Sequence, residues 1–151
     1  EVFNQAGFRD PAGQAVRLLE ARTFSPPDRS ALEPSRCGEF GWLSLPAADV
    51  AAELGFWEAL GLHARAEDTQ PFTRMSREAD GLELAWHRPR WFAEPLLVFR
   101  EAEMAARIAH LRAAGVGPLE PPPRGLDPKA NAVLAAPEGT ALLLLADPGP
   151  A

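Results

Sequence analysis

The stretch that decides the fold reads Leu45-Pro46-Ala47-Ala48-Asp49 and, after a further six residues, Phe56-Trp57-Glu58-Ala59-Leu60-Gly61-Leu62. Asp49 is a favoured N-cap, because an aspartate side chain accepts a hydrogen bond from a free amide in the first turn of a helix. Val50, Leu54 and Trp57 follow at helical spacing, and Gly61 is typical of the residue that ends a helix. The stretch therefore predicts a strand, an amphipathic helix and a sharp stop.

A β-α-β-β-β pattern is expected around this stretch, and it occurs twice. The first set has strands at 39–45, 63–67, 72–77 and 82–87. The second has strands at 96–100, 117–120, 130–135 and 140–146, with a helix whose apolar stripe holds Met104, Ile108 and Leu111. The sequence therefore predicts an α+β domain over residues 39–147.

A short repeat precedes this domain. Pro11 matches Pro137 and Gly13 matches Gly139, so both pairs are 126 residues apart (137 − 11 and 139 − 13). In each copy the proline and the glycine lie in a turn between two apolar segments, where proline presets φ and glycine accepts a positive φ. We therefore interpret residues 1–25 as the closing hairpin of a preceding domain, residues 26–38 as a proline-rich linker, and the start at Glu1 as lacking earlier sequence.

The composition argues against several classes of binding partner. The 151 residues carry a net charge of -6 at pH 7, which argues against nucleic acid, whose binding needs a basic surface. Cys37 is the only cysteine, so no intrachain disulfide can form, and this favours a reducing, cytoplasmic setting. The longest apolar run, residues 141–146, is far too short to span a bilayer, so no membrane partner is expected.

The quoted stretch and two later segments resemble the vicinal-oxygen-chelate superfamily, which includes glyoxalase I, extradiol dioxygenases and bleomycin-resistance proteins. The later segments are Phe99-Arg100-Glu101 with Leu111-Arg112-Ala113-Ala114-Gly115-Val116, and Pro137-Glu138-Gly139. The resemblance covers residues 39–147. It implies two βαβββ units that form a funnel-like mixed sheet with the helices outside, and pairing either of tandem domains or in a homodimer.

The resemblance also implies four metal-ligand positions, and this chain has lost most of them. The positions fall on Trp42, Glu83, Leu96 and Leu143, and only Glu83 keeps a ligand side chain. In the truncated first copy the position equivalent to Leu143 holds Arg17. A zinc or iron site needs about three protein ligands, so no metal and no cofactor is expected.

Strand alternation predicts what lines the funnel instead. Most of the inward positions are apolar, and the polar ones are a serine, a glutamate and a histidine. The expected ligand-binding residues are Phe40, Trp42, Ser44, Glu83, His87, Leu96, Val98, Leu143 and Leu145, with Ala85 and Ala141 beside them. Such a wall suits an apolar or aromatic ligand held by a few polar groups.

Several alternatives are open at this point. Trp42 is either a stacking platform or a plug that fills the funnel. Glu83 is either a general base or cation anchor, or a carboxylate that faces water at the funnel mouth, where an arginine could pair with it. Trp86 and Trp91, close to Arg88 and Arg90, form a cationic-aromatic patch in sequence.

We favour a metal-free small-molecule-binding protein that sequesters its ligand as bleomycin-resistance proteins do. The alternative is an enzyme of the glyoxalase or dioxygenase family. Its active site would lie in the expected N-terminal domain, or would use Glu83 and His87 without metal. A third interpretation is a degenerate domain kept for dimerisation.

Overall fold

The α+β fold and the order of its elements are as expected from the sequence. The computed structural model describes residues 4–20, 35–64, 72–77 and 82–147. The described strands are β1 Gln5–Arg9, β2 Ala15–Leu19, β3 Glu39–Pro46, β4 His63–Ala64, β5 Thr73–Arg77, β6 Leu82–His87, β7 Leu96–Glu101, β8 Leu119–Glu120, β9 Ala132–Ala135 and β10 Ala141–Ala146. The helices are α1 Val50–Ala59 and α2 Met104–Ala113.

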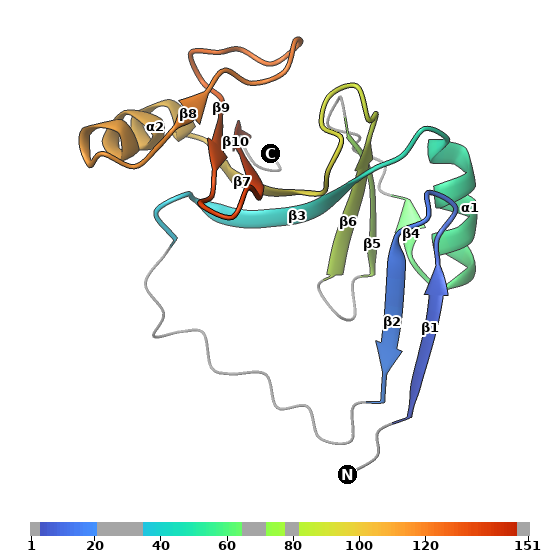
Figure 1. Cartoon of the computed structure of the whole chain (residues 1–151). Helices are drawn as coiled ribbons and strands as arrows, with labels where there is room; N and C mark the ends of the chain where they lie inside the picture. The colour runs from blue at the N-terminus through green and yellow to red at the C-terminus, as the bar shows by residue number, and fades with distance from the viewer. Residues whose placement is uncertain (1–3, 21–34, 65–71, 78–81, 148–151) are drawn as a thin grey trace.

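Eight of the described strands form one mixed sheet in the order β4-β5-β6-β3-β7-β10-β9-β8. β3 and β7 are antiparallel neighbours at its centre, while β6 runs parallel to β3 and β10 parallel to β7. The two halves are therefore alike, each a strand followed by a helix and three more strands. Figure 1 shows α1 and α2 outside the sheet at its opposite ends. No helix in the described part of the chain is long and apolar enough to cross a membrane.

Both helices begin or end as their sequences predict. The Asp49 side chain accepts a hydrogen bond from the Ala52 amide at 3.1 Å, which caps α1. Gly61 follows α1 with a φ of 89°, and Gly115 follows α2 with a φ of 71°, a left-handed conformation that glycine adopts without strain.

The buried side chains form three clusters. One lies under α1 and contains Trp57, Met75, Leu84 and Trp86. Another lies under α2 and contains Met104, Ile108, Leu111, Ala132 and Leu144. The third lies on the opposite, inner face of the sheet and is built around Trp42. Alternation along the strands thus divides the apolar residues between the helix-covered face and the inner face.

The N-terminal hairpin repeats the turn that closes the main sheet. In one turn the Gly13 amide donates to the Asp10 carbonyl at 2.9 Å, and in the other the Gly139 amide donates to the Ala136 carbonyl, also at 2.9 Å. The two glycines have φ values of 88° and 93°. The flanking strands also share one register. β1–β2 and β9–β10 are therefore the same hairpin occurring twice.

The turn of this first hairpin packs on α1. The Phe8 ring lies 5.6 Å from the Phe56 ring in an edge contact. The Ala12 amide donates a hydrogen bond to the Glu53 carboxylate at 2.6 Å. The strands themselves extend away from the body (Figure 1). Only the turn end of the hairpin is therefore anchored by the contacts described.

We propose that residues 1–25 close a preceding domain, as β9 and β10 close this one. β10 pairs with β7 and with β9, whereas β2, in the described part of the chain, pairs with β1 alone. Leu18 and Leu19 of β2 are 52% and 67% exposed, while their counterparts Leu144 and Leu145 are 0% and 2% exposed. The free edge and exposed leucines of β2 are what a missing neighbour would cover.

Hydrogen exchange compares the protection of β2 with that of β10 within one molecule. In the monomer, the amides of β2 are expected to exchange much faster than those of β10, because an isolated two-stranded hairpin is marginally stable in water. Mass spectrometry of peptides from the two strands would give the comparison. Equally slow exchange in a proven monomer would mean that residues 1–25 belong to the domain of residues 39–147.

Candidate functional site

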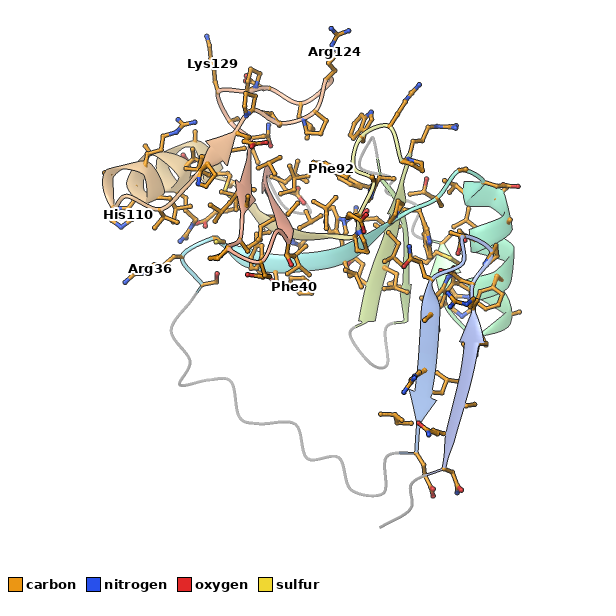
Figure 2. The ribbon with its side chains drawn as sticks, viewed as in Figure 1. Arg36, Phe40, Phe92, His110, Arg124 and Lys129 are labelled. Carbon is orange, nitrogen blue, oxygen red and sulfur yellow. The ribbon has the colours of Figure 1, made fainter. Side chains whose placement is uncertain are left out.

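The inner face of the sheet is filled by its own side chains. Trp42, Leu96, Val98 and Leu143 have no exposed surface, and Leu145 is 2% exposed. The same cluster contains Phe72, Ala85 and Val133, with Phe92, Leu126 and Ala141 packed against it. In Figure 2, Phe92 lies between the two halves of the sheet. The sequence did not predict Phe72, Phe92, Leu126 and Val133 for the inner face, whereas it did predict the other members of this cluster. A ligand that touched Trp42 would have to displace some of these neighbours.

The inward placement of Phe40 was wrong. Phe40 lies opposite Phe99 on β7, whereas Trp42 lies opposite Val98, and the register shifts between the two positions. Adjacent β7 residues face opposite sides of the sheet, so this bulge turns Phe40 to the α2 side. There its ring meets Phe99 at 5.8 Å and remains 52% exposed. Strict alternation cannot anticipate an extra residue in one strand.

Glu83 is paired with an arginine that the sequence analysis did not single out. Arg74 Nη1 lies 3.1 Å from Glu83 Oε1, and the Arg74 guanidinium lies 4.7 Å from the centre of the Trp42 ring. Arg74 is 5% exposed. A guanidinium over an indole face is an attractive cation–π arrangement, especially where water is excluded. The Glu83 carboxylate thus has a cation beside it, and the Arg74 guanidinium packs on the Trp42 ring.

His87 is bound through both of its nitrogens. Nε2 lies 3.0 Å from the Phe92 carbonyl oxygen and Nδ1 lies 2.7 Å from Ser44 Oγ. A carbonyl only accepts, so Nε2 carries the proton and Nδ1 accepts from the Ser44 hydroxyl. Burial lowers the pKa of His87, and the Phe92 carbonyl acts in the opposite direction. His87 is therefore a neutral imidazole that ties β3 and β6 to the chain at Phe92.

The Ser44–His87 contact has the form of an activated nucleophile, but no substrate reaches it in this conformation. Ser44 is 0% exposed and His87 is 1% exposed. A shared role for His87 and Glu83 was one interpretation of the sequence, but the structure pairs His87 with Ser44, which lies on a different strand. β3 and β6 are parallel neighbours, and this alignment brings Ser44 beside the residues around His87.

These side chains do not fit a metal. Among the described residues, no three histidine, cysteine, aspartate or glutamate side chains gather as metal ligands would. Trp42, Leu96 and Leu143 offer no lone pair suited to a divalent ion. A metal beside Glu83 would also meet the Arg74 guanidinium. The donor set therefore gives no basis for a reaction step through a metal.

A cleft lies between the loop that joins β6 to β7 and the loop that joins β8 to β9. It has a volume of about 530 Å³ and is lined by Arg90, Trp91, Pro123 and Arg124. The Trp91 ring touches Phe72 at a centroid distance of 6.4 Å, so the cleft lies directly beside the inner cluster. Of the cationic-aromatic patch seen in the sequence, Trp91 and Arg90 line this cleft.

Trp86 does not take part in that patch. It is 1% exposed and packs under α1, because it lies on the helix-covered side of β6. Arg124 comes instead from a loop more than thirty residues later in the chain, counted from Arg90 (124 − 90 = 34). Only the folded arrangement of the two loops brings Arg124 to Trp91.

No family model and no curated protein matches this chain. A solved structure described as a NAD-dependent benzaldehyde dehydrogenase from Legionella pneumophila has 17% sequence identity and a TM-score of 0.53, and the match covers 68% of this chain and 94% of that chain. At this identity the likeness shows the fold alone.

Two other solved structures match the chain at lower TM-scores. One is a glyoxalase/bleomycin resistance protein/dioxygenase superfamily member from Vibrio splendidus 12B01, at 14% identity and a TM-score of 0.44, covering 68% of this chain and 92% of that chain. Another is a bleomycin resistance determinant encoded on the transposon Tn5, at 20% identity and a TM-score of 0.28, covering 68% and 92%.

Proposed function

We propose that residues 39–147 form a metal-independent binding domain for a small organic molecule, which it sequesters rather than transforms. The observation that carries this is the packed apolar interior at the positions where the sequence resemblance implies metal ligands. Trp42, Leu96 and Leu143 fill the centre of the inner face and have no exposed surface. The ligand then binds at the cleft beside Trp91, above the inner cluster.

The inner residues named from the sequence have a defined place in this proposal. Trp42, Ser44, Glu83, His87, Leu96, Val98, Leu143 and Leu145 form the deep wall, and Phe92 and Leu126 cover it. An apolar ligand group that displaced Phe92 or Leu126 would bury its own surface there, at roughly 25 cal/mol per Å² of apolar area. The polar groups of this wall would orient such a group and supply little of the affinity.

The geometry supports catalysis by Glu83 and His87 less well than it supports ligand binding. The two nitrogens of His87 are occupied by Ser44 and by the Phe92 carbonyl. Glu83 contacts Arg74. His87 is also 1% exposed, so a substrate does not reach its ring in this conformation.

Metal content and ligand binding together test the proposal. After dialysis against Zn²⁺, Ni²⁺ or Fe²⁺ and then buffer, elemental analysis is expected to find far less than one metal per chain. A thermal-shift screen of metabolites and antibiotics in EDTA is expected to yield a stabilising compound. A ligand at one hundred times its Kd stabilises a protein by about 2.7 kcal/mol.

Two results would overturn it. One is a tightly held metal per chain that is lost in Glu83→Ala, since that would restore the metal-dependent enzyme interpretation. The other is a screen in which every stabilising compound requires added metal. An Asp49→Ala variant is the control for general destabilisation, because it removes a helix cap on the outside of the sheet and leaves the inner face intact.

A further inference from the structure

We propose that the cleft lined by Arg90, Trp91, Pro123 and Arg124 selects a planar aromatic molecule that carries an anionic oxygen group, such as an aromatic carboxylate. This rests on the proposed function and names the ligand class for it. Three features of the cleft favour such a ligand: its charge, its aromatic wall and the anchoring of its two loops.

The charge of the cleft is opposite to that of the chain. The protein has a net charge of -6, yet two arginines line this space. Arg90 and Arg124 are exposed, and neither forms an ion pair with any residue that the structure describes. A guanidinium binds a carboxylate through two parallel hydrogen bonds, so an arginine without an acidic partner is a ready anion receptor.

The neighbouring acidic residues do not serve as partners for these two arginines. Glu94 and Asp127 lie on the same two loops, and both are exposed. Asp127 is engaged within its own loop, where its side chain accepts a hydrogen bond from the Lys129 amide at 2.9 Å. Arg124 and Lys129 extend outward from this loop in Figure 2. The local excess of positive charge thus remains available to a ligand.

Trp91 and Pro123 supply flat walls for a ring. The Trp91 ring meets Phe72 edge to face, with 86° between the two planes, and is partly exposed on the cleft side of the chain. Aromatic rings stack on an indole face, and a volume of about 530 Å³ lies within the range of small-ligand sites. A ring between these walls would place an attached carboxylate within reach of the arginines.

The inner cluster holds the two loops in place. Phe92 follows Trp91 directly, packs on the inner cluster, and its carbonyl accepts the hydrogen bond from His87. Leu126 anchors the second loop by packing on the same cluster. The buried Ser44–His87 pair therefore acts as a support for the cleft. A preformed site of this kind loses less entropy when its ligand binds.

Isothermal titration with matched probes tests the proposal on the full chain. 2-Naphthoate is expected to bind at least tenfold more tightly than the neutral 2-naphthamide, and inorganic phosphate alone is expected to show no measurable binding. Arg90→Gln and Arg124→Gln should each weaken naphthoate about tenfold and leave naphthamide nearly unchanged, because each removes one charged donor. Trp91→Ala should weaken both aromatic probes.

The control is Arg112→Gln, which removes an exposed arginine from α2, outside the cleft lining, and is expected to leave all affinities unchanged. Equal binding of naphthoate and naphthamide, or equal losses in the Arg112 and Arg124 variants, would overturn the proposal. Phosphate binding without naphthoate binding would show a plain anion site and would overturn it as well. If compounds from the metal-free screen bind but ignore both cleft arginines, the cleft assignment fails while the proposed function stands. If nothing binds in either experiment, both fail.

Discussion

Replacing Trp42 by alanine is expected to lower the free energy of unfolding by about 3–5 kcal/mol, the usual cost of removing a large buried aromatic side chain. Trp42 is 0% exposed and lies at the centre of the inner cluster. Its ring touches Phe72 at 5.8 Å and supports the Arg74 guanidinium at 4.7 Å. The variant would leave a cavity beneath a buried charge, and urea denaturation would measure the loss.

Two comparison variants test whether the loss of stability comes from the packing of the Trp42 ring. Trp42→Phe keeps an aromatic ring against Phe72 and removes an indole N–H that is buried without a hydrogen-bond partner among the described residues. It should therefore cost much less, about 1 kcal/mol. Trp91→Ala removes a partly exposed indole at the cleft and should also cost much less than Trp42→Ala. A loss below 1 kcal/mol in Trp42→Ala, with weaker ligand binding, would indicate that the inner face is an open funnel.

The elements could be predicted from the sequence because their signals are local. Asp49, Gly61 and Gly115 mark helix ends through hydrogen bonds and φ angles that depend on a few adjacent residues. The repeated Pro-x-Gly turns are likewise local, and the structure shows them to be equivalent in hydrogen bonding and register. Alternation within the strands correctly placed Trp42, Leu96 and their neighbours on one face.

What the sequence did not reveal depends on contacts between distant residues. Phe40 leaves the inner face because of a bulge whose position is set by pairing with β7. Arg74 seemed an ordinary polar residue of a strand, and only the alignment of β5 with β6 puts it beside Glu83. The cleft joins loops from separate parts of the chain, so neither loop alone signals a site.

Glu53 is the clearest case of this kind, since it lies in a helix and is 0% exposed. Its carboxylate accepts hydrogen bonds from the Ala12 amide at 2.6 Å and from Trp57 Nε1 at 3.2 Å. It therefore joins α1 to the turn of the N-terminal hairpin, 41 residues away. Charged residues are almost never fully buried without partners, and here the partners come from a segment that helical spacing cannot foresee.

Glu53→Ala is expected to cost about 2–4 kcal/mol, because each buried donor left without an acceptor costs about 1–3 kcal/mol. The loss should be accompanied by faster hydrogen exchange at the hairpin turn, including the Ala12 amide. Glu58→Ala, an exposed change on the same helix, is the control and should leave both quantities nearly unchanged. Unchanged exchange at Ala12 in the Glu53 variant would show that the carboxylate does not hold the hairpin.

The same carboxylate makes stability depend on pH. Burial, and then the nearby Asp10 carboxylate, raise the pKa of Glu53 above its ordinary value of 4.5, although its hydrogen bonds act in the opposite direction. A raised pKa means that the folded state binds the proton more tightly than the unfolded state. The proton-linked part of the Glu53 contribution to stability is therefore fully present below its unfolded pKa and is lost as pH rises through the higher folded pKa, while the hydrogen bonds to the carboxylate remain. Denaturation curves across this window should show that loss in the wild type and in Glu58→Gln but not in Glu53→Gln, which cannot ionise. A Glu53→Gln variant with the full wild-type pH dependence would assign the effect to another group.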